Sequence, residues 1–378
     1  MYQDEMYPLE LLRGMLEIYS PSGKEDKIAS YLADELKRAG FSRVWTDSVN
    51  NVYGEVGSAG PTILLCGHMD TVPGWIPVRV EGDRLYGRGS VDAKSSLAAM
   101  IISASSLKSS LSRGRILVAC VVDEEGRARG IKRLVRDRPS IDYAIFGEPS
   151  GIKNVVFAYK GHLKIRIEFR TATGHVGAQH LLPNAIEKGF EFWSKLKERC
   201  EREYKSPYGI FYSLTPALTG ISGRGTTRSI PDICTLEVDL RLPPTIKCGD
   251  AMKIIGGLID DFRAENYGLA SKLRIIDRVE PYVARRDTVV VKSLKDAILE
   301  VTGEEARLLR KTGTGDMNIF GAHYNVPVAT YGPGDSSLSH TPNEYISITE
   351  YLASIEIYKR AVKKILDSSG VSKMAVGK

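Results

Sequence analysis

Several apolar runs in the first half of the chain end just before polar residues that can take part in chemistry. The first run, Ile63–Cys66, has the length of a buried strand and is followed by His68 and Asp70. Residues two apart in an extended chain point the same way, so Asp70 can orient the His68 imidazole. Taken alone, this pattern fits either a metal site or a hydrogen-bonded turn.

Two later apolar runs end in carboxylates. Arg115–Val122 is followed by Glu124 and Glu125, and Tyr143–Phe146 is followed by Glu148. Helical segments separate these runs, and this alternation indicates parallel strands in an α/β sheet. Open α/β sheets place their sites at the carboxyl ends of the strands. We therefore expect these carboxylates to converge with the imidazole that follows the first run.

Apolar residues at helical spacing predict helices near both ends of the chain: Leu9–Ile18, Lys24–Ala39, Val290–Val301 and Ile348–Leu366. The pattern also predicts helices at 95–107 and 130–136, and short strands at 44–46, 51–55 and 306–309. The final residues, Ser368–Lys378, carry no such pattern and are expected to form a disordered tail.

From about residue 158 the pattern changes to alternating and amphipathic segments. Strands are predicted at 163–169, 211–218, 234–240 and 271–276, and helices at 186–196 and 252–263. This β-α-β-β-α-β order predicts an antiparallel sheet with two helices. We therefore expect an α/β domain of residues 1–157 and 280–378, with a mostly parallel sheet flanked by helices. An α+β domain of residues 158–279 is inserted into it.

Composition narrows the class of protein. The chain has 378 residues, 43% hydrophobic and 26% charged, which suits a globular protein of two domains. No run approaches a membrane span and Met1–Glu10 does not resemble a signal peptide, so we expect a cytoplasmic protein with no membrane partner. The five cysteines are scattered and never spaced as Cys-x-x-Cys, which favours buried thiols over disulfides or thiolate-bound metal.

The net charge of +6 favours an acidic partner. Basic side chains are interleaved with acidic ones, as on a solvated helix face, and the sequence therefore predicts no nucleic-acid partner.

Two further polar segments complete a set of metal-binding residue types. A glycine-rich loop carries Asp92, and its glycines follow a polar hairpin instead of a buried strand, which argues against a dinucleotide site. His340 lies in a second polar segment near the C-terminus. Two imidazoles and several carboxylates suit two zinc-like ions that share one carboxylate. The pair Glu124 and Glu125 can supply one base and one ligand, because a free Glu beside the metal can act as general base.

These segments resemble, in order, the five signature blocks of the di-zinc aminoacylase and carboxypeptidase superfamily, which includes acetylornithine deacetylase and succinyl-diaminopimelate desuccinylase. The blocks are Ile63–Pro73, Tyr86–Lys94, Asp123–Gly126, Gly147–Pro149 and Ser339–Glu344. The resemblance implies two divalent metal ions, with zinc expected and cobalt as the alternative. It implies that one ion is held by His68, Asp92 and Glu148, and the other by Asp92, Glu125 and His340, with Asp92 bridging.

The resemblance also implies roles for two further acids. Asp70 would orient His68, and Glu124 would act as general base and later as general acid. In the superfamily, a glutamate at the position of Glu148 accompanies deacylases and carboxypeptidases, and an aspartate accompanies aminopeptidases.

The inserted domain resembles the lid of this superfamily, which usually pairs two subunits, so a homodimer is expected. His175 matches a lid histidine that reaches the partner's active site and stabilises an oxyanion. Arg241 matches a lid arginine that binds a substrate carboxylate, although a strand-end ion pair is an equal alternative. Thr314 and Asp316 lie where the superfamily has a substrate loop, and the match there is looser.

Within the superfamily, this chain most resembles, in its length and in the sequence of Gly87–Lys94, the hydrolases that release lysine or ornithine from an acidic amino-group carrier protein. In those substrates the amino acid is joined by an isopeptide bond to the carrier's C-terminal glutamate. Acetylornithine deacetylase and a general aminoacylase or carboxypeptidase are the alternative enzymes. A metal-dependent binding protein without activity is the non-enzymatic alternative, but such a relative is expected to lack the base or a ligand, and here both are present.

Overall fold

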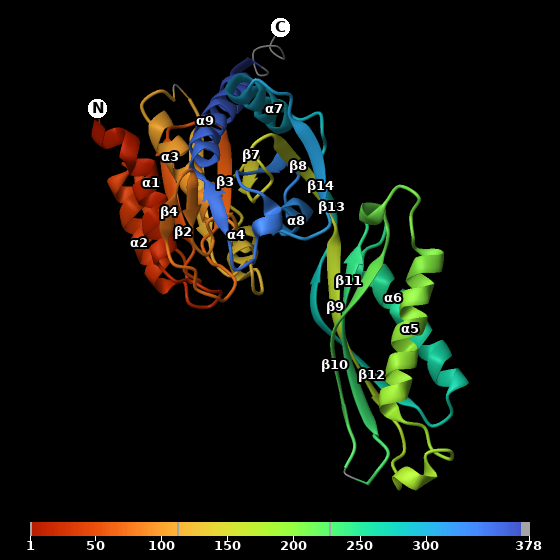
Figure 1. The fold of residues 1–378 in the computed structure, drawn as a ribbon. Coiled ribbons are helices and arrows are strands. Elements are labelled where there is room, and N and C mark those ends of the chain that lie inside the picture. The colour runs from red at the N-terminus through yellow and green to blue at the C-terminus, as the bar shows by residue number, and fades with distance from the viewer. Residues whose placement is uncertain (1, 112, 227, 372–378) are drawn as a thin grey trace. The chain divides into compact units, whose positions relative to one another are not determined.

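The computed structural model describes residues 2–111, 113–226 and 228–371 (Figure 1). The chain divides into two compact units. The larger unit comprises Met1–Phe157, Ala284–Leu309 and Ile319–Lys378, and the inserted unit comprises Ala158–Val283 and Arg310–Asn318.

The segment Arg310–Asn318 groups with the inserted unit, whereas the sequence pattern assigns it to the first domain. The buried side chain of Asn318 explains this grouping. Its amide donates to the carbonyl oxygens of Lys160 and Glu280 at 3.0 and 2.9 Å, near the two ends of the insertion. These bonds join residues 158 and 38 positions apart, so no local pattern in the sequence could reveal them.

The centre of the larger unit is a sheet whose middle strands are parallel and adjacent. They lie in the order β6 (Arg115–Val121), β3 (Thr62–His68), β7 (Tyr143–Gly147) and β15 (Val328–Tyr331). All seven residues of β3 are buried, as expected for a central parallel strand with both faces covered. The predicted α/β sheet is thus confirmed.

Further strands extend this sheet at both edges and make it mixed. They are β2 (Val52–Gly57) and β1 (Arg43–Thr46) on one side, and β8 (Asn154–Tyr159), β13 (Tyr282–Val283) and β14 (Arg307–Lys311) on the other. The pairs β1–β2, β2–β6, β8–β15 and β8–β13 are antiparallel. Strands β8 and β15 were not predicted from the sequence, because both are short runs without a regular alternation.

The helices around this sheet are α1 (Tyr2–Glu17), α2 (Asp26–Arg38), α3 (Lys94–Leu107), α4 (Arg129–Asp137), α7 (Val289–Thr302), α8 (Asp316–His323) and α9 (Ile348–Val371). Small residues let α3 approach β7 closely: a Cβ added at Gly147 would lie only 3.0 Å from the Cβ of Ser96. No described helix is both long and apolar enough to cross a membrane.

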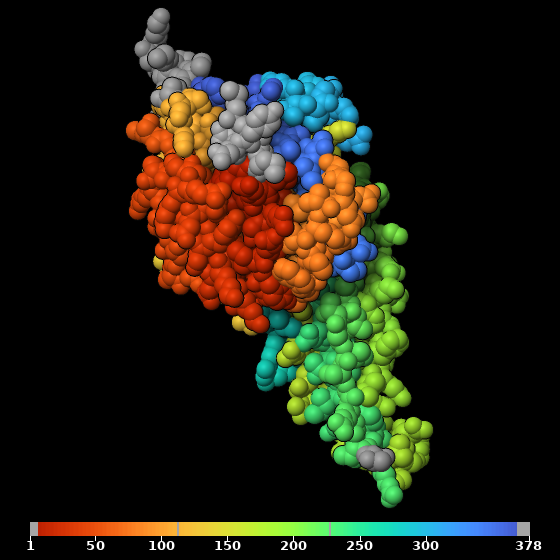
Figure 2. All heavy atoms as spheres, turned by 60° about the vertical axis from the view of Figure 1, so that its left-hand side comes forward, coloured from red at the N-terminus to blue at the C-terminus, as the bar shows by residue number. Residues whose placement is uncertain are grey.

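A small antiparallel sheet joins two parts of the larger unit that are far apart in the sequence. It has the order β16 (Tyr345–Ser347), β5 (Arg84–Tyr86) and β4 (Arg79–Glu81). On the face shown in Figure 2, orange atoms that include β4 and β5 lie beside blue atoms of the C-terminal region. This sheet holds the loop after β5 next to the segment before β16.

The inserted unit is an antiparallel sheet in the order β10 (Thr215–Arg224), β11 (Ile233–Leu242), β9 (Gly161–Arg170) and β12 (Ala270–Val279). Helices α5 (Ala185–Glu203) and α6 (Cys248–Glu265) cover one face (Figure 1). Alternate residues of β9 and β11 are buried beneath these helices. The chain order β9-α5-β10-β11-α6-β12 confirms the predicted β-α-β-β-α-β arrangement.

Two sequence-based predictions were wrong. The strand predicted at 211–218 begins only at Thr215, because Ile210–Tyr212 forms a short 3₁₀ helix whose loop is anchored by the buried ammonium of Lys160. Lys160 Nζ donates to the carbonyl oxygens of Ile210 and Ser213 at 3.0 and 2.6 Å. The tail was predicted to begin at Ser368, but α9 continues to Val371; residues 372–378 lie outside the described part of the chain. The five cysteines are free and buried.

Three aromatic rings form the centre of the inserted unit's core. Phe169, Phe192 and Phe262 lie with ring centroids 5.1 to 5.8 Å apart, and all three are buried. Offset and edge-to-face contacts of this kind add to the stabilisation from burial.

Replacing Phe192 with Ala is expected to lower the free energy of unfolding by about 3–5 kcal/mol, because it removes apolar contacts and leaves a cavity. Urea denaturation followed by circular dichroism would measure the change. Tyr267 is fully exposed in the same unit, so Tyr267→Ala should change stability by no more than about 0.5 kcal/mol. Equal losses in the two variants would contradict a core role for the aromatic trio.

Candidate metal centre

Three adjacent strands end at the same edge of the central sheet and present candidate residues there. His68 is the last residue of β3, Glu124 and Glu125 follow β6, and Glu148 follows β7. Because the three strands are parallel neighbours, their carboxyl ends bring these side chains together. The convergence that the strand pattern predicts is therefore present.

The imidazole of His68 is buried and oriented by Asp70. Its Nδ1 lies 2.9 Å from the carbonyl oxygen of Asp70 and 3.6 Å from a carboxylate oxygen of the same residue. A carbonyl oxygen can only accept, so Nδ1 carries a proton and Nε2 is the nitrogen that a metal ion would contact. Nε2 faces Asp92 at 3.3 Å and Glu148 at 4.0 Å.

Two groups of potential ligands share Asp92. One ligand atom each from His68, Asp92 and Glu148 lies within 4.8 Å of the others, and the same holds for Asp92, Glu125 and His340. His340 Nε2 lies 2.7 Å from Glu125 Oε1 and 3.4 Å from Asp92 Oδ2. Asp92 is thus placed where it can contact two ions at once.

Asp70 also fixes the turn that carries the glutamate pair. Its two carboxylate oxygens accept hydrogen bonds from the backbone N–H groups of Glu124 and Glu125 at 3.0 and 3.1 Å. The hydroxyl of Ser22 donates to the same carboxylate at 2.6 Å. These hydrogen bonds and the contact with His68 lower the pKa of Asp70 against the opposing effect of burial.

The chain reverses sharply before the glutamate pair. Asp123 has a left-handed φ of 62°, which is uncommon for a residue with a side chain. The guanidinium of Arg129 donates to its carboxylate at 2.8 Å, and the N–H of Ala128 donates to its carbonyl oxygen at 2.6 Å. The surroundings therefore hold a costly conformation at the point where Glu124 and Glu125 are presented.

The two glutamates differ in the groups that they can join. Glu125 belongs to the group with Asp92 and His340. A third combination, His68, Glu124 and Glu125, meets the same distance limit, so Glu124 lies beside the other donors. This position suits a base next to the ions. The same distances would also allow Glu124 to bind a metal ion itself.

The carboxylates strongly favour positive charge at the two imidazoles. Burial favours the neutral form of His68, but hydrogen bonds to Asp70 and Asp92 raise its pKa well above the ordinary value. Hydrogen bonds to Asp92 and Glu125 raise the pKa of His340 to about 10. Both shifts favour a protonated ring, so a metal ion would compete with a proton at each imidazole.

The donor set fits divalent metal ions. Imidazole nitrogen and carboxylate oxygen are ligands that zinc and neighbouring transition metals accept. Each group offers one histidine and two carboxylates, with one carboxylate common to both. Buried acids and imidazoles crowded in this way are most readily stabilised by cations placed between them.

The four predicted substrate-contact residues all lie in the inserted unit. His175 is exposed, and its Nδ1 accepts a hydrogen bond from the N–H of Gly177 at 3.1 Å. Its proton is therefore on Nε2, which can donate to an anionic oxygen. Arg241 forms an ion pair with Asp239 at 3.2 Å, the alternative that the sequence left open.

The loop before α8 is held from within the inserted unit. Thr314 is half-buried and Asp316 is buried in the first turn of α8. The side-chain oxygen of Asn318 accepts from the N–H of Gly315 at 3.1 Å, which fixes the glycine-rich turn. Asn318 was not predicted from the sequence, since its only signal is a polar residue inside an apolar helix.

Other residues near the donor groups were also missed. Ser22 lies in the loop between α1 and α2, and nothing in its local pattern points to Asp70. Lys94 follows Asp92 by two positions and is buried, with Nζ donating to the carbonyl oxygens of Met15 and Ile18 at 2.9 and 3.0 Å. Burial lowers the pKa of Lys94 to about 7.

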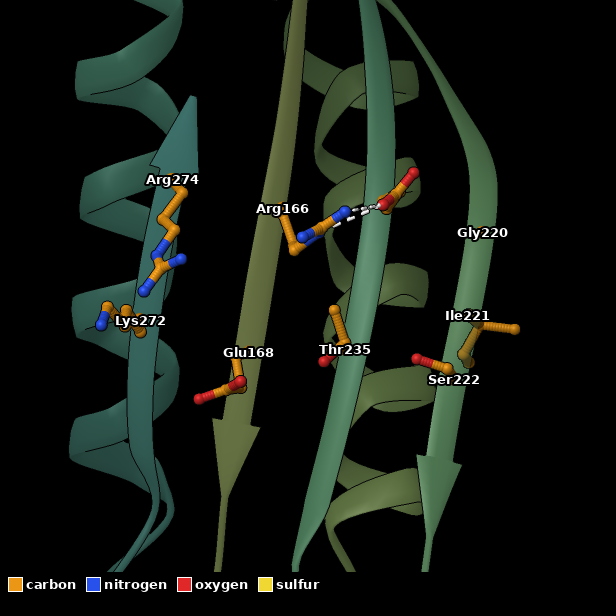
Figure 3. Close-up of a pocket in the computed structure, with 9 residues that line it drawn as sticks. Arg166, Glu168, Gly220, Ile221, Ser222, Thr235, Lys272 and Arg274 are labelled. Carbon is orange, nitrogen blue, oxygen red and sulfur yellow. Dashed lines mark hydrogen bonds and ion pairs between the residues drawn. The ribbon is translucent and has the colours of Figure 1, made fainter. Parts of the chain in front are cut away.

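The open face of the inserted sheet carries a separate concavity of about 450 Å³. Figure 3 shows Lys272 and Arg274 of β12 and Arg166 of β9 on the face away from the helices. Arg166 is paired with Glu237 at 2.6 Å. Within the described residues, Lys272 and Arg274 have no ion-pair partner within 4.0 Å; Glu168 lies in register opposite Lys272 and is paired with Arg170. We call Arg166, Lys272 and Arg274 the basic patch.

Comparison with known proteins agrees with this geometry. The LysW-lysine hydrolase of Deinococcus radiodurans is 34% identical over 371 residues, covering 94% of this chain and 96% of that protein. A protein of Pyrococcus abyssi, to which hydrolysis of LysW-lysine and LysW-ornithine is ascribed, is 36% identical and covers 94% of both chains. The M20 family metallo-carboxypeptidase of Sulfolobus solfataricus has the same fold, with a TM-score of 0.76, 18% identity and coverage of 95% and 99%.

The family match includes most of the sequence segments that build the site. Residues 64–364 match the family described as Peptidase family M20/M25/M40. This range contains all of the candidate ligands and Glu124. The matched range, the shared fold and the paired donor groups together show that the chain belongs to peptidase family M20/M25/M40 and is a metallohydrolase.

Proposed function

We propose that this protein releases lysine or ornithine from LysW, an amino-group carrier protein, by hydrolysing the isopeptide bond at the carrier's C-terminal glutamate. Relatives with these substrates in their names align with 94% of the chain at 34–36% identity. The observation that carries the proposal is the pair of donor groups that share Asp92, with Glu124 beside them. A binding protein without activity would not need this base.

The proposed ligands are divided between two divalent ions, with zinc as the metal we favour. His68, Asp92 and Glu148 would hold one ion, and Asp92, Glu125 and His340 the other. When bound, such ions supply Lewis acidity that polarises a carbonyl group and makes water more acidic. The distances within each donor group support this assignment.

In the proposed reaction Glu124 acts first as general base and then as general acid. Its carboxylate takes a proton from the attacking water as the new C–O bond forms, and later gives that proton to the nitrogen as the C–N bond breaks. The products are the carrier with a free glutamate carboxylate and an amino acid with a free amine. Asp70 supports this step by holding the backbone of Glu124.

We propose that the inserted unit contributes to substrate binding in a homodimer. The Nε2–H of His175 would stabilise the oxyanion in the partner's site, since hydrogen-bond donors aimed at developing charge lower the barrier. Arg241 would bind a substrate carboxylate by exchanging its pairing with Asp239. Exposed apolar side chains at Val176, Leu181 and Phe190 suit a surface covered by another subunit.

The acidic carrier would meet the basic patch of the inserted sheet. Lys272 and Arg274 of β12 have no ion pair within the described chain, and Thr235 of β11 and Ser222 of β10, farther across the same face, can donate hydrogen bonds (Figure 3). Complementary charge mainly speeds encounter and sets specificity.

The reaction itself is tested by giving metal-loaded enzyme two substrates: acetylornithine, and LysW with lysine linked to its C-terminal glutamate. We expect lysine to be released from LysW and acetylornithine to be hydrolysed poorly, with free amino acid measured by chromatography. Efficient cleavage of acetylornithine alone would instead make the protein a small-molecule deacetylase, with the same metal centre.

Replacing Glu124 with Gln is expected to lower kcat by about 10²- to 10⁴-fold, because the amide cannot carry the proton. Metal content measured by atomic emission should stay at the wild-type level. Glu125→Gln is the matched control and should lose metal as well as activity. Loss of metal from the Glu124 variant would identify Glu124 as a ligand, and near-normal turnover would remove it from the mechanism.

Reversing charge in the basic patch, with Lys272→Glu and Arg274→Glu together, is expected to raise KM for LysW-lysine by about 10-fold or more. The kcat should change little, since neither residue belongs to the metal centre. Activity of wild-type enzyme should fall with added salt, and the variant should be less sensitive to it. An unchanged KM would place the carrier elsewhere on the surface.

A further inference from the structure

A buried ion pair lies directly behind the donor groups. Arg88 and Glu344 are 8% and 1% exposed, and Arg88 Nη1 donates to Glu344 Oε2 at 2.9 Å. The two residues are 256 positions apart. Burying two charges is costly unless both are well paired, so such a pair often serves to fix a structure rather than to stabilise it.

The other hydrogen bonds of this pair reach segments that carry proposed ligands. Glu344 Oε1 accepts from the backbone N–H groups of Val91 and Asp92 at 2.9 and 3.1 Å. The carboxylate of Glu344 therefore holds the main chain of the residue that would bridge both ions. It lies four positions after His340, and β16 then ties this segment to β5.

The other end of the pair reaches the segment after β3. Arg88 Nε donates to the carbonyl oxygen of Gly74 at 2.9 Å. Gly74 lies in the loop that follows His68 and Asp70. The ion pair thus connects three separate segments, which contain His68, Asp92 and His340.

The conformation of His340 makes this connection more important. Its φ is +65°, a left-handed value that costs free energy for a residue with a side chain and persists only when the surroundings enforce it. Its side chain is also the more exposed of the two proposed histidine ligands, at 49% against 1%. Packing around the ring therefore contributes less to its position than for His68.

We infer that Arg88 and Glu344 are positioning residues that set the distance between the two metal sites by fixing the Asp92 loop against the His340 and His68 segments. This inference rests on the ligands of the proposed metal centre. It does not depend on which amide the enzyme cleaves. Neither residue is proposed to touch substrate or metal.

Metal binding tests the inference without substrate. Metal-free wild-type protein, Glu344→Gln and Arg88→Lys would be titrated with Zn²⁺ against a chromophoric chelator, and with Co²⁺ while its visible absorption is recorded. Gln at 344 keeps an acceptor for the two backbone N–H groups but loses the ion pair. We expect about 10- to 100-fold weaker binding of both ions, as for other residues that orient metal ligands, and an altered cobalt spectrum.

Arg88→Lys should have a smaller effect. A lysine keeps the positive charge, but its single ammonium cannot contact Glu344 and Gly74 with the planar fork of a guanidinium. Partial recovery in this variant, relative to Arg88→Met, would support positioning by the ion pair.

Asp83→Asn is the matched control. Asp83 accepts hydrogen bonds from Thr349 and Ser347, so it also joins the β5 segment to the β16 segment, but at the end away from Asp92 and His340. We expect this variant to lose thermal stability while binding both ions as tightly as wild type.

Three results would overturn the inference. One is unchanged zinc affinity and an unchanged cobalt spectrum in Glu344→Gln. Another is equal weakening in Asp83→Asn, which would mean a general loss of structure. The third is a wild-type protein that binds no metal, and this result would also overturn the proposed centre. If Glu344→Gln does not fold, Arg88→Lys and Arg88→Met are compared by the same zinc titration and cobalt spectrum. Equal metal binding in these two variants and in wild type would then overturn the inference.

Discussion

Carboxylates crowd together at one edge of the central sheet, and their mutual repulsion is the constraint on which the surrounding structure depends. Two of these negative charges have compensating hydrogen bonds in the protein itself. Asp70 is held by two backbone N–H groups and the Ser22 hydroxyl, and Glu344 by Arg88 and two more backbone N–H groups. Asp92 and Glu125 lie beside the imidazoles of His68 and His340, where cations can be accommodated. A charge without such a partner would be expelled or neutralised.

Much of this arrangement could be predicted because it follows from local patterns. An apolar run followed by a polar residue identifies a strand and the residue at its end, and parallel neighbours bring such ends together. His68, Glu125 and Glu148 are of this kind. Asp92 and His340 lie in loops, and for them the order of the five blocks and their family resemblance were needed.

The features that the sequence did not reveal depend on contacts between distant positions. Asn318 acts through Lys160 and Glu280, and Arg88 acts through Glu344. In each case the polar residue has no distinctive pattern in its own segment, and its structural role is visible only from its contact with a distant residue. The misplaced strand at 211–218 has the same origin, because Lys160 anchors a turn fifty residues downstream.

The distance along the chain between Glu125 and His340 has a consequence for biosynthesis. The two residues are 215 positions apart, and their side chains meet only after the inserted unit and the last parallel strand have been made. Domains generally fold as the ribosome releases them, starting from the N-terminus. During synthesis, His68, Asp92 and Glu148 therefore emerge well before His340, and the group of Asp92, Glu125 and His340 stays incomplete until His340 is released. The proposed two-ion centre can therefore be completed only in the final stage of the protein's synthesis.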